Sequence, residues 1–271
     1  MNEKSVEVQP FFRPLGEDPQ GRERFRANPT TVGPWRPDSQ HGGPPAALLA
    51  RAIELLPAAQ GMLLARFTME LLRPVPVAEV ATTARVVRPG RRVAFAESTL
   101  YDAPAGQPIA LAQAWLLPGH RDGPGSPTPP ATGPDQHCSL AGARGWGGGY
   151  IDAMEWRWVS GDAYGLGPGA AWMRSPDLVE GEPITPVQRV LAGVDSASGI
   201  SGCLDTSHWA FLNTELTVHL LRPPEGEWVL VDAETTLSDG SAGLATSTIS
   251  DIRGVVGRSA QTLLVQQLPE R

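Results

Sequence analysis

Two short segments of the sequence combine residue types that suit chemistry on a carbonyl or a phosphate group. His41, Gly42 and Gly43 open an apolar run, and N–H groups at a helix start can stabilise an oxyanion where glycines let a ligand approach the backbone. The glycines could equally serve only to make the turn, and a lone histidine there could be structural. Farther along, Arg88 and Arg91 lie in the string RPGRRV, whose planar guanidinium groups suit phosphate, although solvated turn residues are the simpler interpretation.

Several familiar catalytic patterns are missing from the sequence. It contains no Gly-x-Ser-x-Gly elbow for a serine hydrolase and no Walker-type loop, and the glycine-rich string at Gly145 precedes a predicted strand rather than a helix. No HxxxH, CxxC or clustered Asp/His spacing indicates a metal site. The only cysteines, Cys138 and Cys203, fall in a probable linker and a probable helix, which argues against a disulfide framework. Water is therefore the expected nucleophile if the protein is a hydrolase.

Composition and charge exclude further classes. The formal net charge is −7 and the pI is near 5.3, so the chain carries no overall positive field for binding nucleic acid. No run approaches the ~18 apolar residues of a membrane span, which predicts a soluble protein. The amino terminus, MNEKSVEVQPFFRPLG, has no apolar core after its lysine, so we expect no secretory signal and a cytoplasmic location.

The elements that must position these residues are one buried helix and a sheet that wraps it. Pro44 and Pro45 suit a first helical turn, and the residues that follow to Leu56 are strong helix formers with only Arg51 and Glu54 charged. Such a helix must be buried on most sides. Strand-like runs follow it in the first half of the chain at Met62 to Leu72, Val77 to Val87, Val93 to Tyr101 and Ile109 to Leu117.

The second half repeats this order at an offset of about 150 residues. Two short strands, a helix from Pro186 to Cys203 and four longer strands are predicted again. The string ELLRPVPVAEV at Glu70 matches HLLRPPEGEWV at His219, and ALAQAWLL at Ala110 matches GRSAQTLLV at Gly257 with its glutamine at the corresponding place. The sequence therefore predicts an N-terminal repeat over residues 1–118, a Pro/Gly-rich linker over 119–149 and a C-terminal repeat over 150–271.

A helix that opens with His-Gly-Gly inside a duplicated antiparallel sheet resembles the type II acyl-CoA thioesterases. The strings QHGGPPAALLARA, LNTELTVHLLRPPEGEW, DAETT and GRSAQTLLV carry the likeness over nearly the whole chain outside the linker. The resemblance implies an α+β tandem (double) hot-dog fold, in which two antiparallel sheets each wrap a central helix and join into one continuous sheet. It also implies hydrolysis of an acyl-CoA to a carboxylic acid and free CoA, with no metal or organic cofactor, and a homodimer.

In that family an acid, a hydroxyl and an amide of the second repeat hold one water molecule. Alignment on Arg222 and Trp228 places these roles on Glu215, Thr236 and Gln261, which we expect on three neighbouring strands. Glu215 would be the base or water anchor, Thr236 would orient the water, and Gln261 would bind it through its amide. Glu215 departs from the family's aspartate, and each of the three also has a plain structural interpretation in a strand.

The resemblance leaves alternatives and supporting residues to consider. Asp195 on the second helix is a rival base or a wall of the site, because single hot-dog thioesterases often place an acid there. His41, Gly42, Gly43 and Asp195 would line the substrate, with Arg88 and Arg91 on the CoA phosphates. The acyl chain would enter an apolar tunnel between helix and sheet, whose depth periodicity does not give. A protein that binds acyl-CoA without cleaving it is the main alternative, and a hydratase, which would be expected to use an Asp/His pair, is a weaker one.

Overall fold

A computed structural model describes residues 8–119, 123–126, 128–130, 132–136, 147–161 and 165–268. Within these ranges the first half contains β1 (Phe12–Glu17), β2 (Glu23–Ala27), α1 (Gly43–Glu54), β3 (Met62–Leu71), β4 (Glu79–Arg88), β5 (Ala94–Asp102) and β6 (Gln107–Pro118). The second half contains α2 (Gly149–Ala153), β7 (Glu155–Ser160), β8 (Gly169–Arg174), α3 (Pro186–Val194), α4 (Ala197–Ile200), β9 (Trp209–Asn213), β10 (Glu215–Leu220), β11 (Val229–Leu237), β12 (Ala242–Asp251) and β13 (Gly254–Gln267). Cys138 lies outside the described residues.

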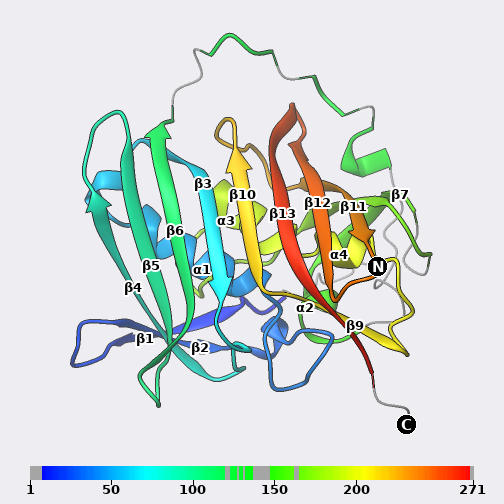
Figure 1. Ribbon diagram of the computed structural model, residues 1–271. Helices are drawn as coiled ribbons and strands as arrows, with labels where there is room; N and C mark the ends of the chain where they lie inside the picture. Colours follow the sequence, from blue (N-terminus) through cyan, green and yellow to red (C-terminus); the bar gives the residue numbers. More distant parts are fainter. Residues whose placement is uncertain are drawn as a thin grey trace, which may run out of the picture.

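The described strands form one antiparallel sheet that joins the two halves. Its order is β1-β2-β4-β5-β6-β3-β10-β13-β12-β11-β8-β7, with β9 paired to β13. The halves meet at β3 and β10, and α1 and α3 lie together on one face of the sheet (Figure 1). Thr68 of β3 pairs with Thr217 of β10, 149 residues later, with 3.3 Å between the hydroxyl oxygens. The two halves are therefore related by an approximate twofold axis through this pair.

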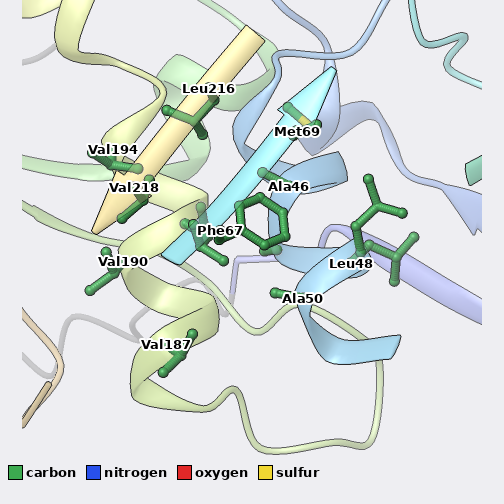
Figure 2. Packing of buried hydrophobic residues seen from close by; sticks show 14 of the residues in the cluster. Ala46, Leu48, Ala50, Phe67, Met69, Val187, Val190, Val194, Leu216 and Val218 are labelled. Atoms are coloured by element: carbon green, nitrogen blue, oxygen red, sulfur yellow. The ribbon is translucent and has the colours of Figure 1, made fainter. Parts of the chain in front are cut away.

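One hydrophobic core fills the space between the helix pair and the sheet. Ala46, Leu48 and Ala50 come from α1. Figure 2 shows Ala46 and Ala50 on the side of the helix that faces Phe67 and Met69 of β3, and Leu48 on its other side. Val187, Val190 and Val194 of α3 and Leu216 and Val218 of β10 complete the same cluster. Small residues on α1 let the two helices approach closely, and larger side chains from the strands fill the remaining volume. Both halves therefore contribute to a single core.

Several predicted elements are interrupted in the structure. The expected helix Pro186 to Cys203 is two helices, because α3 ends at Val194 and α4 begins at Ala197. The expected strand His208 to Leu221 is likewise split into β9 and β10 at Thr214. The expected strand Tyr150 to Ser160 begins instead with the short helix α2. The first two interruptions lie close to each other in space and flank the pocket described next.

Candidate active site

A pocket of about 280 Å³ opens beside the N-terminus of α1. Four segments surround it: the loop before α1, the loop after β3, the junction between α3 and α4, and the junction between β9 and β10. Trp35, Leu71, Val75 and Phe211 give it apolar walls, and Asp195 contributes a carboxylate. The pocket therefore combines an apolar surface with one buried acid, as small-molecule sites commonly do.

The two glycines before α1 are required by close contacts with α3. A side chain at Gly42 would place its Cβ 2.7 Å from Asp195 Oδ2, and one at Gly43 would lie 2.1 Å from the carbonyl oxygen of Ala192. Gly42 has φ −69°, which any residue adopts, so space rather than backbone conformation demands glycine there. The His-Gly-Gly string thus brings the N-terminus of α1 against the C-terminus of α3.

Asp195 is held by amide side chains from two strands. It lies at the C-cap of α3 and is 4% exposed. Its Oδ1 accepts hydrogen bonds from Asn213 Nδ2 at 2.7 Å and from Gln261 Nε2 at 3.0 Å. Gln261 is fully buried, donates also to the Asp195 carbonyl at 3.1 Å, and accepts from the Ser198 backbone N–H at 3.3 Å. Both partners fix the carboxylate, and they fully engage one of its oxygens.

The second oxygen of Asp195 faces His41 and Gly42. Oδ2 lies 3.2 Å from His41 Nδ1, which is also 3.2 Å from the backbone nitrogen of Gly43. The His41 ring stacks on Tyr150 with centroids 3.7 Å apart and planes within 2°. Burial lowers the pKa of His41, and the neighbouring Asp195 opposes that shift only in part. The imidazole is therefore neutral at pH 7.

Tyr150 fixes this histidine platform to the helix. Its hydroxyl donates to the Ala192 carbonyl at 2.8 Å and lies 2.9 Å from Ser196 Oγ. Burial raises the pKa of Tyr150, so the ring remains a neutral phenol. Tyr150 lies in the short helix α2, directly after the predicted linker, and sequence periodicity gave no signal for its role.

Glu215 and Thr236 do not lie with Gln261, so the predicted three-residue water site is wrong in its geometry. Glu215 lies on the side of β10 opposite the buried Leu216 and accepts hydrogen bonds from the Thr262 backbone N–H at 2.7 Å and from Thr217 Oγ1 at 3.0 Å. Its carboxylate thereby satisfies a strand N–H beside the break at residue 214. Gln261 projects from the other face of the sheet, toward Asp195.

Thr236 is also on the wrong face. It pairs with Leu244, whereas Gln261 pairs with Ala245, and successive residues of a strand point to opposite sides. Moreover, β12 separates β11 from β13, so the three strands are not all neighbours. The preceding residue, Thr235, faces the helices and its hydroxyl lies 2.7 Å from Ser201 Oγ. A shift of one residue in the alignment exchanges these two threonines.

The structure thus brings together four of the predicted residues and adds a fifth. His41, Gly42 and Asp195 line the pocket, and the buried Gln261 contacts Asp195 from behind it. Gly43 follows Gly42 and lies against the backbone of Ala192. Asn213 was missed by sequence reasoning, although an amide at the end of an alternating strand was a signal that could have found it. In the sequence LNTELTV, Asn213 is the last residue of β9, immediately before the interruption at Thr214.

Arg88 and Arg91 lie at the opposite end of the sheet from Asp195. Arg91 lines a separate pocket together with Met62, at the start of β3, whereas Leu71, at its end, lines the pocket of Asp195. The 10 residues of β3 span about 33 Å. The expectation that these arginines share a site with Asp195 is therefore wrong. Arg36 and Arg73 line the Asp195 pocket instead.

The described residues contain no group of three or more His, Cys, Asp or Glu side chains arranged to hold a metal ion. No helix among them is long and apolar enough to span a membrane.

Comparison with known families matches both halves of the chain. The acyl-CoA thioesterase N-terminal domain matches residues 31–117, and the acyl-CoA thioesterase C-terminal domain matches residues 125–265. No curated protein matches the sequence.

Solved structures share the whole architecture at low identity. A provisionally assigned thioesterase II from Thermobifida fusca is similar with a TM-score of 0.72 and 18% identity, covering 98% of each chain. An acyl-CoA thioesterase II, TesB2, from Mycobacterium marinum has a TM-score of 0.67 and 14% identity, covering 94% of this chain and 95% of its own. A protein with a hot-dog fold from Alicyclobacillus acidocaldarius has a TM-score of 0.71 and 16% identity, covering 92% of this chain and 94% of its own. At these identities the likeness establishes the fold, and the predicted tandem hot-dog fold is confirmed.

Proposed function

Because the chain belongs to the acyl-CoA thioesterase family, we propose that it hydrolyses the thioester of an acyl-CoA in the pocket beside Asp195. The products are a carboxylic acid and free CoA. The observation that carries the proposal is the carboxylate of Asp195, which is almost fully buried, lines an apolar pocket and is held by two amides. An acid in this setting is suited to act on a neutral ester bound in the pocket.

Asp195 Oδ2 is the proposed general base. Oδ1 is engaged by Asn213 and Gln261, so Oδ2 is the oxygen from which a water can be activated. That water attacks the thioester carbonyl carbon while its proton passes to Oδ2. The resulting tetrahedral intermediate collapses by breaking the C–S bond, and CoA leaves as a thiolate that takes up a proton from Asp195 or solvent. One water is consumed, and one carboxylic acid and one thiol are formed.

The N-terminus of α1 is the proposed stabiliser of the oxyanion. Helix N-termini carry a partial positive charge. Pro44 and Pro45 have no N–H and the Gly43 N–H donates to His41 Nδ1, so the Gly42 N–H is the group of this turn left to face an oxyanion. The backbone at Gly42 lies so close to Asp195 Oδ2 that no Cβ fits between them. A thioester carbonyl placed beside this turn would therefore have its carbon next to the activated water and its oxygen next to the helix terminus.

His41, Asn213 and Gln261 are assigned positioning roles. Two amides orient one carboxylate oxygen, and a neutral imidazole stacked on Tyr150 limits the space around the other. Since His41 is neutral, its contact with Oδ2 is not an ion pair. Glu215 and Thr236 have no part in this mechanism.

Arg36 and Arg73 replace Arg88 and Arg91 as the proposed partners of the CoA phosphates. Both line the pocket beside Asp195. Arg36 pairs with the exposed Asp38 at 2.8 Å, and Arg73 hydrogen-bonds to the neutral side chain of Gln107. Exposed pairs of this kind contribute little to stability, so a phosphate can exchange with them readily.

Hydrolysis is tested by incubating the purified protein with acyl-CoAs of different chain types. Thiol release is followed with a thiol-trapping dye, and the free acid is identified by mass spectrometry. We expect stoichiometric acid and CoA. Binding of acyl-CoA with no release of thiol across the panel would instead favour the non-catalytic alternative.

The homodimer implied by the resemblance stays a prediction. Leu244 and Leu264 are 44% and 42% exposed on β12 and β13, on the side of the sheet that faces away from the helices. An apolar face of this kind is suited to pairing with a second copy. Sedimentation equilibrium would give twice the mass of 28.8 kDa if this is correct, and a monomer at all concentrations would contradict it.

A further inference from the structure

Buried side chains occupy the space between α1 and β3, where an acyl chain was expected. Ala46 and Ala50 of α1 are fully buried against Phe67 and Met69 of β3, which are at most 1% exposed (Figure 2). None of these four side chains lines the pocket of Asp195. The expected tunnel between helix and sheet is therefore filled by the core, and an acyl group must lie within the pocket itself.

The far wall of that pocket is made by a pair of aromatic rings. Trp35 packs edge-on against Phe211 with centroids 5.0 Å apart. Phe211 belongs to a small buried cluster with Ala245 and Leu263, and Trp35 and Leu204 pack against that cluster. Residues of β12 and β13 thus support Phe211 from behind, and the half-buried Trp35 packs against the same cluster.

We propose that the acyl group of the substrate is compact, either a short chain or a single ring, and that Trp35 and Phe211 set this limit. The inference rests on the proposed function, because it assigns the acyl end of an acyl-CoA to this pocket. A volume of about 280 Å³ lies at the lower end of ligand sites and must also admit the thioester. Two aromatic side chains in the pocket wall also suit contact with a planar ring.

Chain length provides a quantitative expectation. Each methylene that enters the pocket should improve kcat/KM about fourfold, while a methylene left in water gains nothing. Efficiency should therefore rise from acetyl-CoA to butyryl- or hexanoyl-CoA and be high for benzoyl-CoA. For lauroyl- and palmitoyl-CoA, which do not fit, kcat/KM should be at least about tenfold lower than for the best short-chain substrate.

The experiment compares the wild type with variants of the aromatic wall, using all substrates below their micelle concentrations. Trp35→Ala enlarges the pocket and should move the optimum to longer chains, raising the ratio of octanoyl- to butyryl-CoA efficiency about tenfold. Trp35→Phe keeps a smaller ring and should give an intermediate shift, so the test survives if the alanine variant does not fold. Trp115→Ala removes a tryptophan that packs on Phe95 outside the pocket and should leave the ranking unchanged.

A binding measurement separates this inference from the proposed function. The Asp195→Asn variant should bind compact acyl-CoAs more tightly than long-chain acyl-CoAs, because it keeps the pocket walls. Efficient cleavage of palmitoyl-CoA by the wild type would overturn the size limit while leaving hydrolysis intact. Tight binding of compact acyl-CoAs without any cleavage by the wild type would overturn hydrolysis and retain the size limit. Absence of both binding and cleavage would overturn the two together.

Discussion

The two ends of the helix pair differ although the approximate twofold axis relates them. At one end, Asp195 at the C-terminus of α3 faces the N-terminus of α1 across a pocket. At the other, Glu54 at the C-terminus of α1 faces the N-terminus of α3. There the carboxylate accepts hydrogen bonds from Thr185 Oγ1 at 3.0 Å and from Gln188 Nε2 at 2.7 Å. One end is therefore open to a ligand, and the other is closed by its own side chains.

Local sequence explains the difference. Thr185 and Gln188 form a capping box at the start of α3, so polar side chains occupy the helix terminus, and Glu54 is long enough to reach them. At the start of α1, Gly42 and Gly43 have no side chain, and the shorter Asp195 leaves space beside them. The two ends therefore differ in what lies at the helix N-terminus, which is a pocket beside α1 and a helix cap on α3.

The largest expected effect comes from exchanging the two acids for amides. Asp195→Asn removes the proposed base and should lower kcat by about 10²- to 10⁴-fold with thermal stability largely retained. Glu54→Gln is the matched control at the closed end and should keep wild-type activity. Thiol release measures both. Equal loss in the two variants, or full activity of Asp195→Asn, would remove the functional difference between the ends.

The two glycines of α1 should respond differently to alanine. At Gly42 the atoms nearest to a new Cβ belong to the Asp195 carboxylate, which Asn213 and Gln261 hold in place. Displacing that carboxylate should lower activity up to about 100-fold, with a smaller loss of stability than at Gly43. At Gly43 the new Cβ meets the backbone of Ala192, so stability should fall by about 1–3 kcal/mol as the helices separate.

Chemical denaturation and kcat/KM together distinguish these outcomes. Gly240→Ala is a control, because its Cβ would meet nothing within 4 Å and its φ is not positive. Full activity of Gly42→Ala would show that the close approach to Asp195 is not needed.

Gln113 and Gln261, from the last strand of each half, should differ in their effects on stability and activity. Gln261→Ala removes a donor from Asp195 and should cost about 1–3 kcal/mol in stability and reduce activity by about tenfold or more. Gln113→Ala, at the corresponding place in the first repeat's sequence, should change stability by less than about 0.5 kcal/mol, since Gln113 is exposed. Similar effects in both would contradict the assignment of Gln261 to the site.

The smallest effect concerns the pH dependence at the closed end. Burial raises the pKa of Glu54 from 4.5, although Gln188 and Thr185 oppose the shift by hydrogen bonding to it. The folded state then binds this proton more tightly than the unfolded state, so Glu54 reduces stability as pH rises from 4.5 through the raised pKa. Urea unfolding over that range should show Glu54→Gln gaining stability relative to the wild type as pH rises. A difference that is constant with pH would contradict this.

Sequence periodicity predicted the fold well, because apolar residues recur along a strand or helix at the spacing that places them on its buried face. The alternation of apolar residues located the four long strands of each half, and the repeat offset matches the pairing of Thr68 with Thr217. The helix opening at His-Gly-Gly was also found, although the reason for its glycines, the contact with α3, required a tertiary neighbour.

The site was harder to predict because its residues lie where periodicity fails. Asp195 and Asn213 lie where a predicted helix and a predicted strand are interrupted, and their separate halves meet only in the folded chain. Register caused the other errors. Thr68 pairs with Gln113 but Thr217 pairs with Ala260, so the matched glutamines are one residue out of step and face opposite sides of the sheet. A match of sequence strings cannot detect such a shift.

The pairing of Thr68 with Thr217 has a consequence for the history of the chain. Two identical half-length proteins could build the same central ladder with each threonine opposite its own copy, and such an ancestor would have carried two equal binding sites. Fusion of such copies into one gene would let each change independently. One site could then be closed by hydrogen-bonded side chains while the other stayed open.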